Sequence, residues 1–125
     1  MNYEFNFNTY NKALMDFFLN KDSTLPELLL ELVKTNNVDY HTFFEKLQTS
    51  EITFGMVNTE TNIPKIIKGN SNCHLLKNDE YAIGYTFNTS DVNTVGTFLG
   101  KFTIDFGEGE KLIVPIKEKL FIHIQ

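Results

Sequence analysis

The stretch from Val95 to Gln125 alternates apolar and polar residues over almost its whole length. The recurring apolar residues all lie at even positions: Phe98, Phe102, Ile104, Phe106, Leu112, Val114, Ile116, Leu120, Ile122 and Ile124. A period of two is typical of strands that bury one face and expose the other. The stretch therefore predicts about two or three strands, whose apolar face must be covered by another layer of the fold.

Glycine and proline residues divide this stretch. The GEGE sequence at 107–110 predicts a hairpin turn. Pro115 predicts a bulge or a sheet edge, because proline donates no hydrogen bond to a ladder. The spacing leaves open whether residues 117–119 bend the chain into a separate final strand or continue one long strand. Since Pro115 and the terminal position both resist central placement, we expect the final strand to lie at an open edge.

The first half of the chain shows a different period. Alternation of Tyr3, Phe5 and Phe7 predicts a short N-terminal strand. From Thr9 onwards the apolar residues follow helical spacing, which predicts helices over 9–20, over 25–35 and from Asp39 to about Gln48. A capping box formed by Thr24 and Glu27 supports the start of the second helix.

Four further extended segments lie between the predicted helices and the C-terminal stretch, at 52–57, 63–68, 73–76 and 81–87. We expect an α+β fold: an N-terminal strand and about three helices packed on a mainly antiparallel sheet, or partly closed barrel, of about five to seven strands. Residues 1–125 form a single domain in this interpretation, helix-rich over 9–48 and strand-rich over 51–125.

Charge and composition limit the partners. All 11 basic residues are lysine, and the net charge is -5. Arginine supplies the bidentate contacts that grip phosphates and guanine edges, so its absence argues against nucleic-acid binding. The bias towards Asn, Lys, Ile and Phe suggests a low-GC bacterium or a phage as the source.

The same composition predicts a cytoplasmic chain without a membrane anchor. No apolar run approaches the ~18 residues that a membrane span needs. The start, MNYEFNFN, does not resemble a signal peptide, so the chain is expected to begin at Met1. The lone cysteine, Cys73, cannot form an internal disulfide.

Three histidines and one cysteine are the first candidates for chemistry. His41 and Glu45 could share a helical face, but one such pair supplies too few ligands for zinc. Cys73 and His74 are neighbours on a predicted strand, where adjacent side chains point to opposite faces, so they do not form a catalytic pair. His123 is expected at a sheet margin, as an amphipathic side chain or as a pH-sensitive contact.

Asp105, Glu108 and Glu110 surround the predicted hairpin turn and offer oxygen atoms to a cation. The fixed ligand spacing of an EF-hand loop is absent, so solvated carboxylates are the preferred interpretation. No catalytic residue, no cofactor and no metal site is therefore predicted.

What remains is an acidic, aromatic-rich domain without a recognisable chemical centre. We expect a non-enzymatic protein-protein interaction module, such as a subunit of a larger assembly, phage assemblies included, or a small acidic inhibitor. Binding or self-association would use a strand edge, either the 63–68 segment or the final strand, or exposed aromatic side chains. The residues predicted to take part are Ile63, Ile66, Tyr81, Tyr85, Pro115, Phe121 and His123.

The alternative is a small-molecule-binding protein or an enzyme. Its aromatic-lined pocket would lie between helices and sheet, where His41, His74, Tyr81 or Asp105 could converge without a linear motif.

Overall fold

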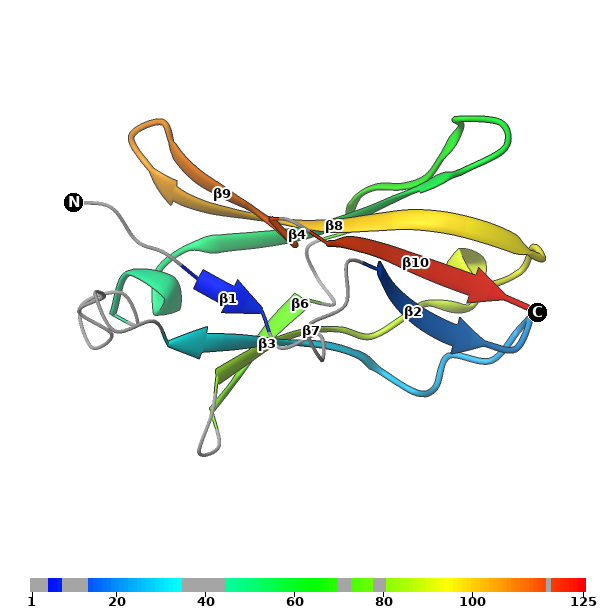
Figure 1. The fold of residues 1–125 in the computed structure, drawn as a ribbon, viewed down its shortest axis with the longest axis horizontal. Coiled ribbons are helices and arrows are strands. Elements are labelled where there is room, and N and C mark those ends of the chain that lie inside the picture. The colour runs from blue at the N-terminus through cyan, green and yellow to red at the C-terminus, as the bar shows by residue number, and fades with distance from the viewer. Residues whose placement is uncertain (1–4, 8–13, 35–44, 70–72, 78–80, 117) are drawn as a thin grey trace.

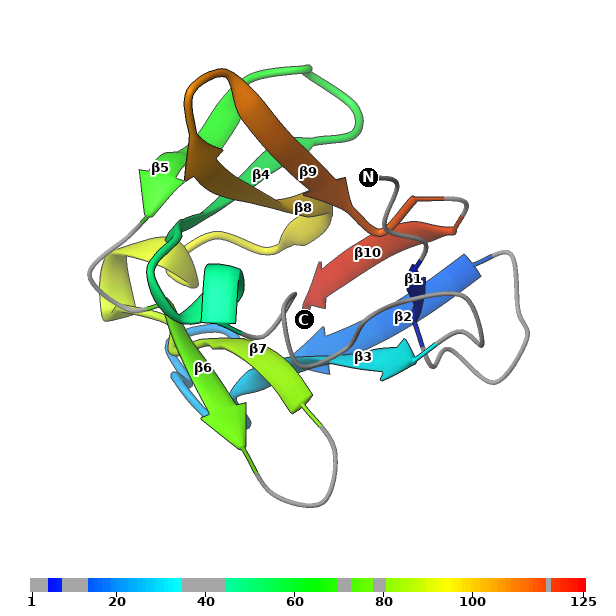
Figure 2. The same ribbon diagram turned by 90° about the vertical axis from the view of Figure 1, so that its left-hand side faces the viewer.

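Two β-sheets that face each other across a shared core make up most of the molecule (Figure 1). The computed structural model describes residues 5–7, 14–34, 45–69, 73–77, 81–116 and 118–125. Within these ranges one sheet has four strands and the other has six. Figure 2 shows the six-stranded sheet curving from β4 round to β2, with β3, β7 and β6 of the other sheet beneath it.

The four-stranded sheet is antiparallel throughout. In spatial order its strands are β1 (Phe5–Phe7), β3 (Leu28–Lys34), β7 (Tyr81–Tyr85) and β6 (Cys73–Lys77). The main path of the six-stranded sheet runs through β2 (Leu14–Leu19), β10 (Lys119–Ile124), β8 (Gly96–Gly107), β4 (Glu51–Asn58) and β5 (Pro64–Gly69). The sixth strand, β9 (Glu110–Val114), pairs with β8. Only the pairing of β2 with β10 is parallel among the described pairs of this sheet.

Strand β8 is the longest and has neighbours along both sides. Strand β4 follows one side, and on the other side β10 pairs with residues 96–100 while β9 pairs with residues 102–107. Val114 lies opposite Phe102, and Leu120 lies opposite Gly100. A continuous strand would have one residue between Val114 and Leu120, whereas the sequence has five, so β9 and β10 are separate strands.

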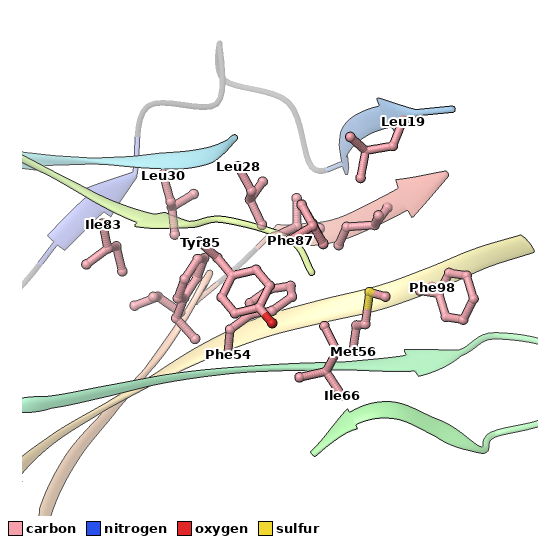
Figure 3. Close-up of a cluster of buried hydrophobic side chains, with 14 of the residues drawn as sticks. Leu19, Leu28, Leu30, Phe54, Met56, Ile66, Ile83, Tyr85, Phe87 and Phe98 are labelled. Carbon is pink, nitrogen blue, oxygen red and sulfur yellow. The ribbon is translucent and has the colours of Figure 1, made fainter. Parts of the chain in front are cut away.

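The core lies between the inner faces of the two sheets (Figure 3). Burial alternates along β8 and β10, as period two predicts, and the even-numbered side chains point inward. The rings of Phe54 and Tyr85 come from opposite sheets and meet with centroids 4.7 Å apart, and Phe102 lies 4.9 Å from Phe54. This aromatic contact joins the two sheets.

The expected α+β class is wrong, because the fold is mainly β. Strand β2 lies inside the first predicted helix and β3 inside the second, whereas the described end of the third, residues 45–48, is helical. The sequences LMDFFL and LLLELVK carry apolar residues on both strand faces. When both strand faces are apolar, some apolar residues fall by chance at the i, i+3 and i+4 spacing that is typical of an amphipathic helix. The layer that covers the C-terminal strands is therefore a second sheet rather than three helices.

The expected edge position of the final strand is also wrong, because β10 lies between β2 and β8. Other local predictions are confirmed: β1 lies in the predicted N-terminal strand, β6 and β7 pair as a hairpin, and residues 107–110 turn between β8 and β9. Gly107 and Gly109 adopt positive φ at that turn, which glycine does without strain. No helix in the described part is long and apolar enough to cross a membrane.

Gly100→Ala should lower the free energy of unfolding by about 1–3 kcal/mol, the usual cost of overpacking a core. A Cβ at this position would lie 2.5 Å from Ile122 Cδ1 and 3.0 Å from Phe54 Cζ, and both of those side chains are buried. Gly96→Ala on the same strand is the matched control, because its Cβ would lie 3.4 Å from the nearest atom.

Chemical denaturation measures both effects. Ile122→Val removes Cδ1, so Gly100→Ala should cost less in the Ile122→Val background than in the wild type. An equal cost in the two backgrounds, or a cost for Gly96→Ala as large as that for Gly100→Ala, would contradict the proposed packing.

Candidate functional site

The outward face of the six-stranded sheet gathers aromatic and polar side chains from three adjacent strands. Burial alternates along these strands, so odd-numbered residues of β8 and β10 and even-numbered residues of β2 face away from the core. The strand registers place six of them side by side. This outer patch consists of Asp16, Phe18, Thr97, Leu99, Phe121 and His123.

Two rows of residues cross the outer patch. In one row, His123 of β10 lies between Phe18 of β2 and Thr97 of β8. In the neighbouring row, Phe121 lies between Asp16 and Leu99. The parallel β2–β10 pairing thus joins residues that are more than a hundred positions apart in the chain.

His123 is held by both ring nitrogens. Its Nε2 lies 2.7 Å from Asp16 Oδ1, and its Nδ1 lies 3.2 Å from Thr97 Oγ1. A carboxylate can only accept a hydrogen bond, so Nε2 carries the proton that is donated to Asp16. In the neutral ring Nδ1 then accepts from the Thr97 hydroxyl. The imidazole plane also stacks on Phe18, with centroids 4.7 Å apart and an interplanar angle of 18°.

The ladder explains why Thr97 reaches His123. The Thr97 carbonyl accepts a hydrogen bond from the Thr59 amide at 3.0 Å, so the Thr97 backbone groups point towards β4. Thr97 and His123 are consequently a non-hydrogen-bonded pair of the antiparallel ladder, the type in which opposite side chains lie closest. Leu99 and Phe121, two residues further along each strand, form the same kind of close pair.

A carboxylate, an imidazole and a hydroxyl that are linked in series by hydrogen bonds are also the parts of a catalytic triad with a hydroxyl nucleophile. Acyl transfer additionally needs free donors aimed at a developing oxyanion. Around Thr97 the strand β8 is paired on both sides, with β10 and with β4, which commits its amide groups to the ladders. We therefore interpret the contacts of His123 as fixing the orientation of its ring.

The structure distributes the predicted interaction residues widely. Phe121 and His123 lie in the outer patch. Tyr85 and Ile66 are in the core, with exposed fractions of 1% and 7%, so neither can serve a surface in this fold. Pro115 is half-buried in the connection between β9 and β10.

Ile63 and the 63–68 segment lie at an edge that is protected against strand addition. Strand β5 ends the sheet path, and two register shifts each give β5 one residue more than β4. Pro64 begins this strand, and Lys65 and Lys68 lie along it, although Ile63 and Ile67 are exposed. Bulges, lysines and proline are the devices by which edge strands avoid pairing. They disfavour β5 as the contact edge.

The remaining candidates for chemistry lie on several different elements. Cys73 and His74 lie on β6, Tyr81 begins β7, and His41 lies outside the described residues. The acidic residues near 105–110 lie at the β8–β9 hairpin, where Glu110 pairs with Lys46 at 2.9 Å. No group of three or more His, Cys, Asp and Glu side chains among the described residues is placed to hold a metal ion.

Sequence reasoning missed four of the six patch residues: Asp16, Phe18, Thr97 and Leu99. The helical interpretation of residues 9–20 hid the first two. A period of two through Met15, Phe17 and Leu19 was the available signal for β2. No protein-family model matches the chain, and a search of curated proteins finds no match.

Tyr85→Phe should lower the free energy of unfolding by about 1–3 kcal/mol. The Tyr85 hydroxyl donates to Asp91 Oδ2 at 2.8 Å, and the Asn88 amide donates to the same oxygen. Because Asp91 is buried, losing the hydroxyl leaves a carboxylate that is less well satisfied.

Thermal or chemical unfolding measures this loss. Thr49→Val is the control, because it removes an exposed hydrogen bond and should change stability by less than about 0.5 kcal/mol. Equal stabilities of Tyr85→Phe and Thr49→Val would show that the Tyr85 hydroxyl contributes no more to stability than an exposed hydrogen bond.

Proposed function

We propose that this chain is a non-enzymatic protein-protein interaction module that binds its partner through the outer patch. A subunit of a larger assembly, phage assemblies included, and a small acidic inhibitor both use such a surface. One observation carries the proposal: Phe18 is 55% exposed although it stacks on a histidine that is itself hydrogen-bonded at both nitrogens.

An exposed aromatic ring beside other apolar side chains is unusual on a solvated sheet face. Leu99 is also exposed, and Phe121 lies 6.3 Å from the His123 ring, centroid to centroid. Exposed apolar groups rimmed by polar residues mark interaction sites on soluble proteins. Aromatic side chains are enriched at the centres of interfaces, where they contribute most of the binding energy.

The outer patch is also pre-organised. Its residues stand on three hydrogen-bonded strands, and the Asp16 and Thr97 contacts fix the imidazole against Phe18. Side chains that are already ordered lose little conformational entropy when they bind. A rigid aromatic surface of this kind suits a protein partner.

A cytoplasmic location is part of the proposal. The chain holds a single cysteine, so it relies on no internal disulfide. Its lysine-only basic composition and net charge of -5 support a protein partner over a nucleic acid.

Site-specific photocrosslinking in the cells that make the protein tests the proposal. A benzophenone-bearing phenylalanine in place of Phe18 should give a discrete crosslinked product. The matched control is the same group in place of Leu29, which is 50% exposed but lies on β3 in the other sheet. Adding Phe121→Ser to the Phe18 probe should remove the product.

Crosslinking at Leu29 without crosslinking at Phe18 would contradict the proposed surface. So would a Phe18 product whose yield does not change with Phe121→Ser. Circular dichroism of each variant checks that its β-sheet content is unchanged.

A further inference from the structure

We propose that the partner segment bound by the outer patch carries a carboxylate beside an apolar anchor, and that Lys101 and Lys119 bind this carboxylate. This inference rests on the proposed function and specifies the chemistry of the partner. It follows from the position of these two lysines, which lie next to Leu99 and Phe121 on the same sheet face.

The two lysines continue the outward face beyond Leu99 and Phe121. Lys101 is two residues after Leu99 on β8, and Lys119 is two residues before Phe121 on β10. Leu120 pairs with Gly100, so Lys101 and Lys119, the next residue on each strand, both lie at this end of the β10–β8 pairing. Both lysines are exposed.

Neither lysine forms an ion pair with another described residue. Within the described ranges Lys46 forms an ion pair with Glu110 and Lys68 with Glu51, and Asp16 is hydrogen-bonded to His123. Lys101 and Lys119 have no such partner among the described residues. A bound anion would give both ammonium groups the partner that these residues do not supply.

Charge complementarity selects a carboxylate on a protein as this anion. The two lysines border the Leu99–Phe121 row of the patch, so their positive charges lie beside exposed apolar side chains and suit an anionic group of a partner. A nucleic acid would instead meet an overall acidic surface without arginine. An acidic side chain next to an apolar one satisfies both parts of the surface.

The sheet geometry sets the spacing of the partner motif. Successive rows on one face are two residues apart along a strand, about 6.6–6.8 Å. An extended segment covers that distance between residues i and i+2. A helix covers a similar distance between residues i and i+4. The motif is therefore an apolar residue with Asp or Glu two or four positions away.

A displayed library of random twelve-residue peptides, selected against the full-length chain, tests the inference. The expected enrichment is of peptides with an apolar residue and Asp or Glu at one of these spacings. The double variant Lys101→Glu/Lys119→Glu should bind the selected peptides at least tenfold more weakly. A new selection against this variant should enrich peptides that carry Lys or Arg in place of the acidic residue. Phe18→Ser should weaken the original peptides, whereas Leu29→Ser should not.

The outcomes separate the inference from the proposed function. Enriched apolar peptides without acidic residues, bound equally well by the lysine double variant, would overturn the inference and leave the outer patch as the contact surface. Selected peptides whose binding is unchanged by Phe18→Ser would overturn both. A library that yields no enriched peptide would also overturn both.

Discussion

The pairing of β8 with strands on both sides is the constraint on which the rest of the structure depends. Residues 96–107 give β4 a partner along one side and divide the other side between β10 and β9. Gly100 lies at the crossing point, where the absence of a side chain lets Phe54 and Ile122 approach. These contacts fix β10 in the interior of the sheet, and β10 in turn holds β2.

Strict alternation along these strands gives each of them two roles. The inward residues bury the core that joins the two sheets, and the outward residues lie in register across β2, β10 and β8. The position of His123 on the surface is therefore determined by the burial of Ile122 and Ile124 on either side of it. An outward face built in this way stands on the same hydrogen-bonded strands as the core beneath it.

The sequence predicted the C-terminal half well because its period of two has one apolar parity. Strands β4 to β10 fall close to the predicted segments, and Phe121 and His123 belong to the patch. The first half failed because β2 and β3 are apolar on both faces, so coincidental helical spacing concealed the period of two through Met15, Phe17 and Leu19. The central place of β10 also escaped prediction, since its parallel partner β2 lies near the other end of the chain. Local patterns carry no signal for such a distant pairing. The sequence therefore did not predict that Asp16 and Phe18 lie beside β10.

The separation of these two roles can be measured on adjacent residues of β10. The free energy of unfolding should fall by less than about 1.5 kcal/mol in Phe121→Ser, because this side chain faces outward and is only partly buried. It should fall by at least about 3 kcal/mol in Ile122→Ser, because that change empties a core position and buries a hydroxyl. Equal losses in the two variants would show that the outer patch serves folding, and would contradict its assignment as a surface kept for a partner.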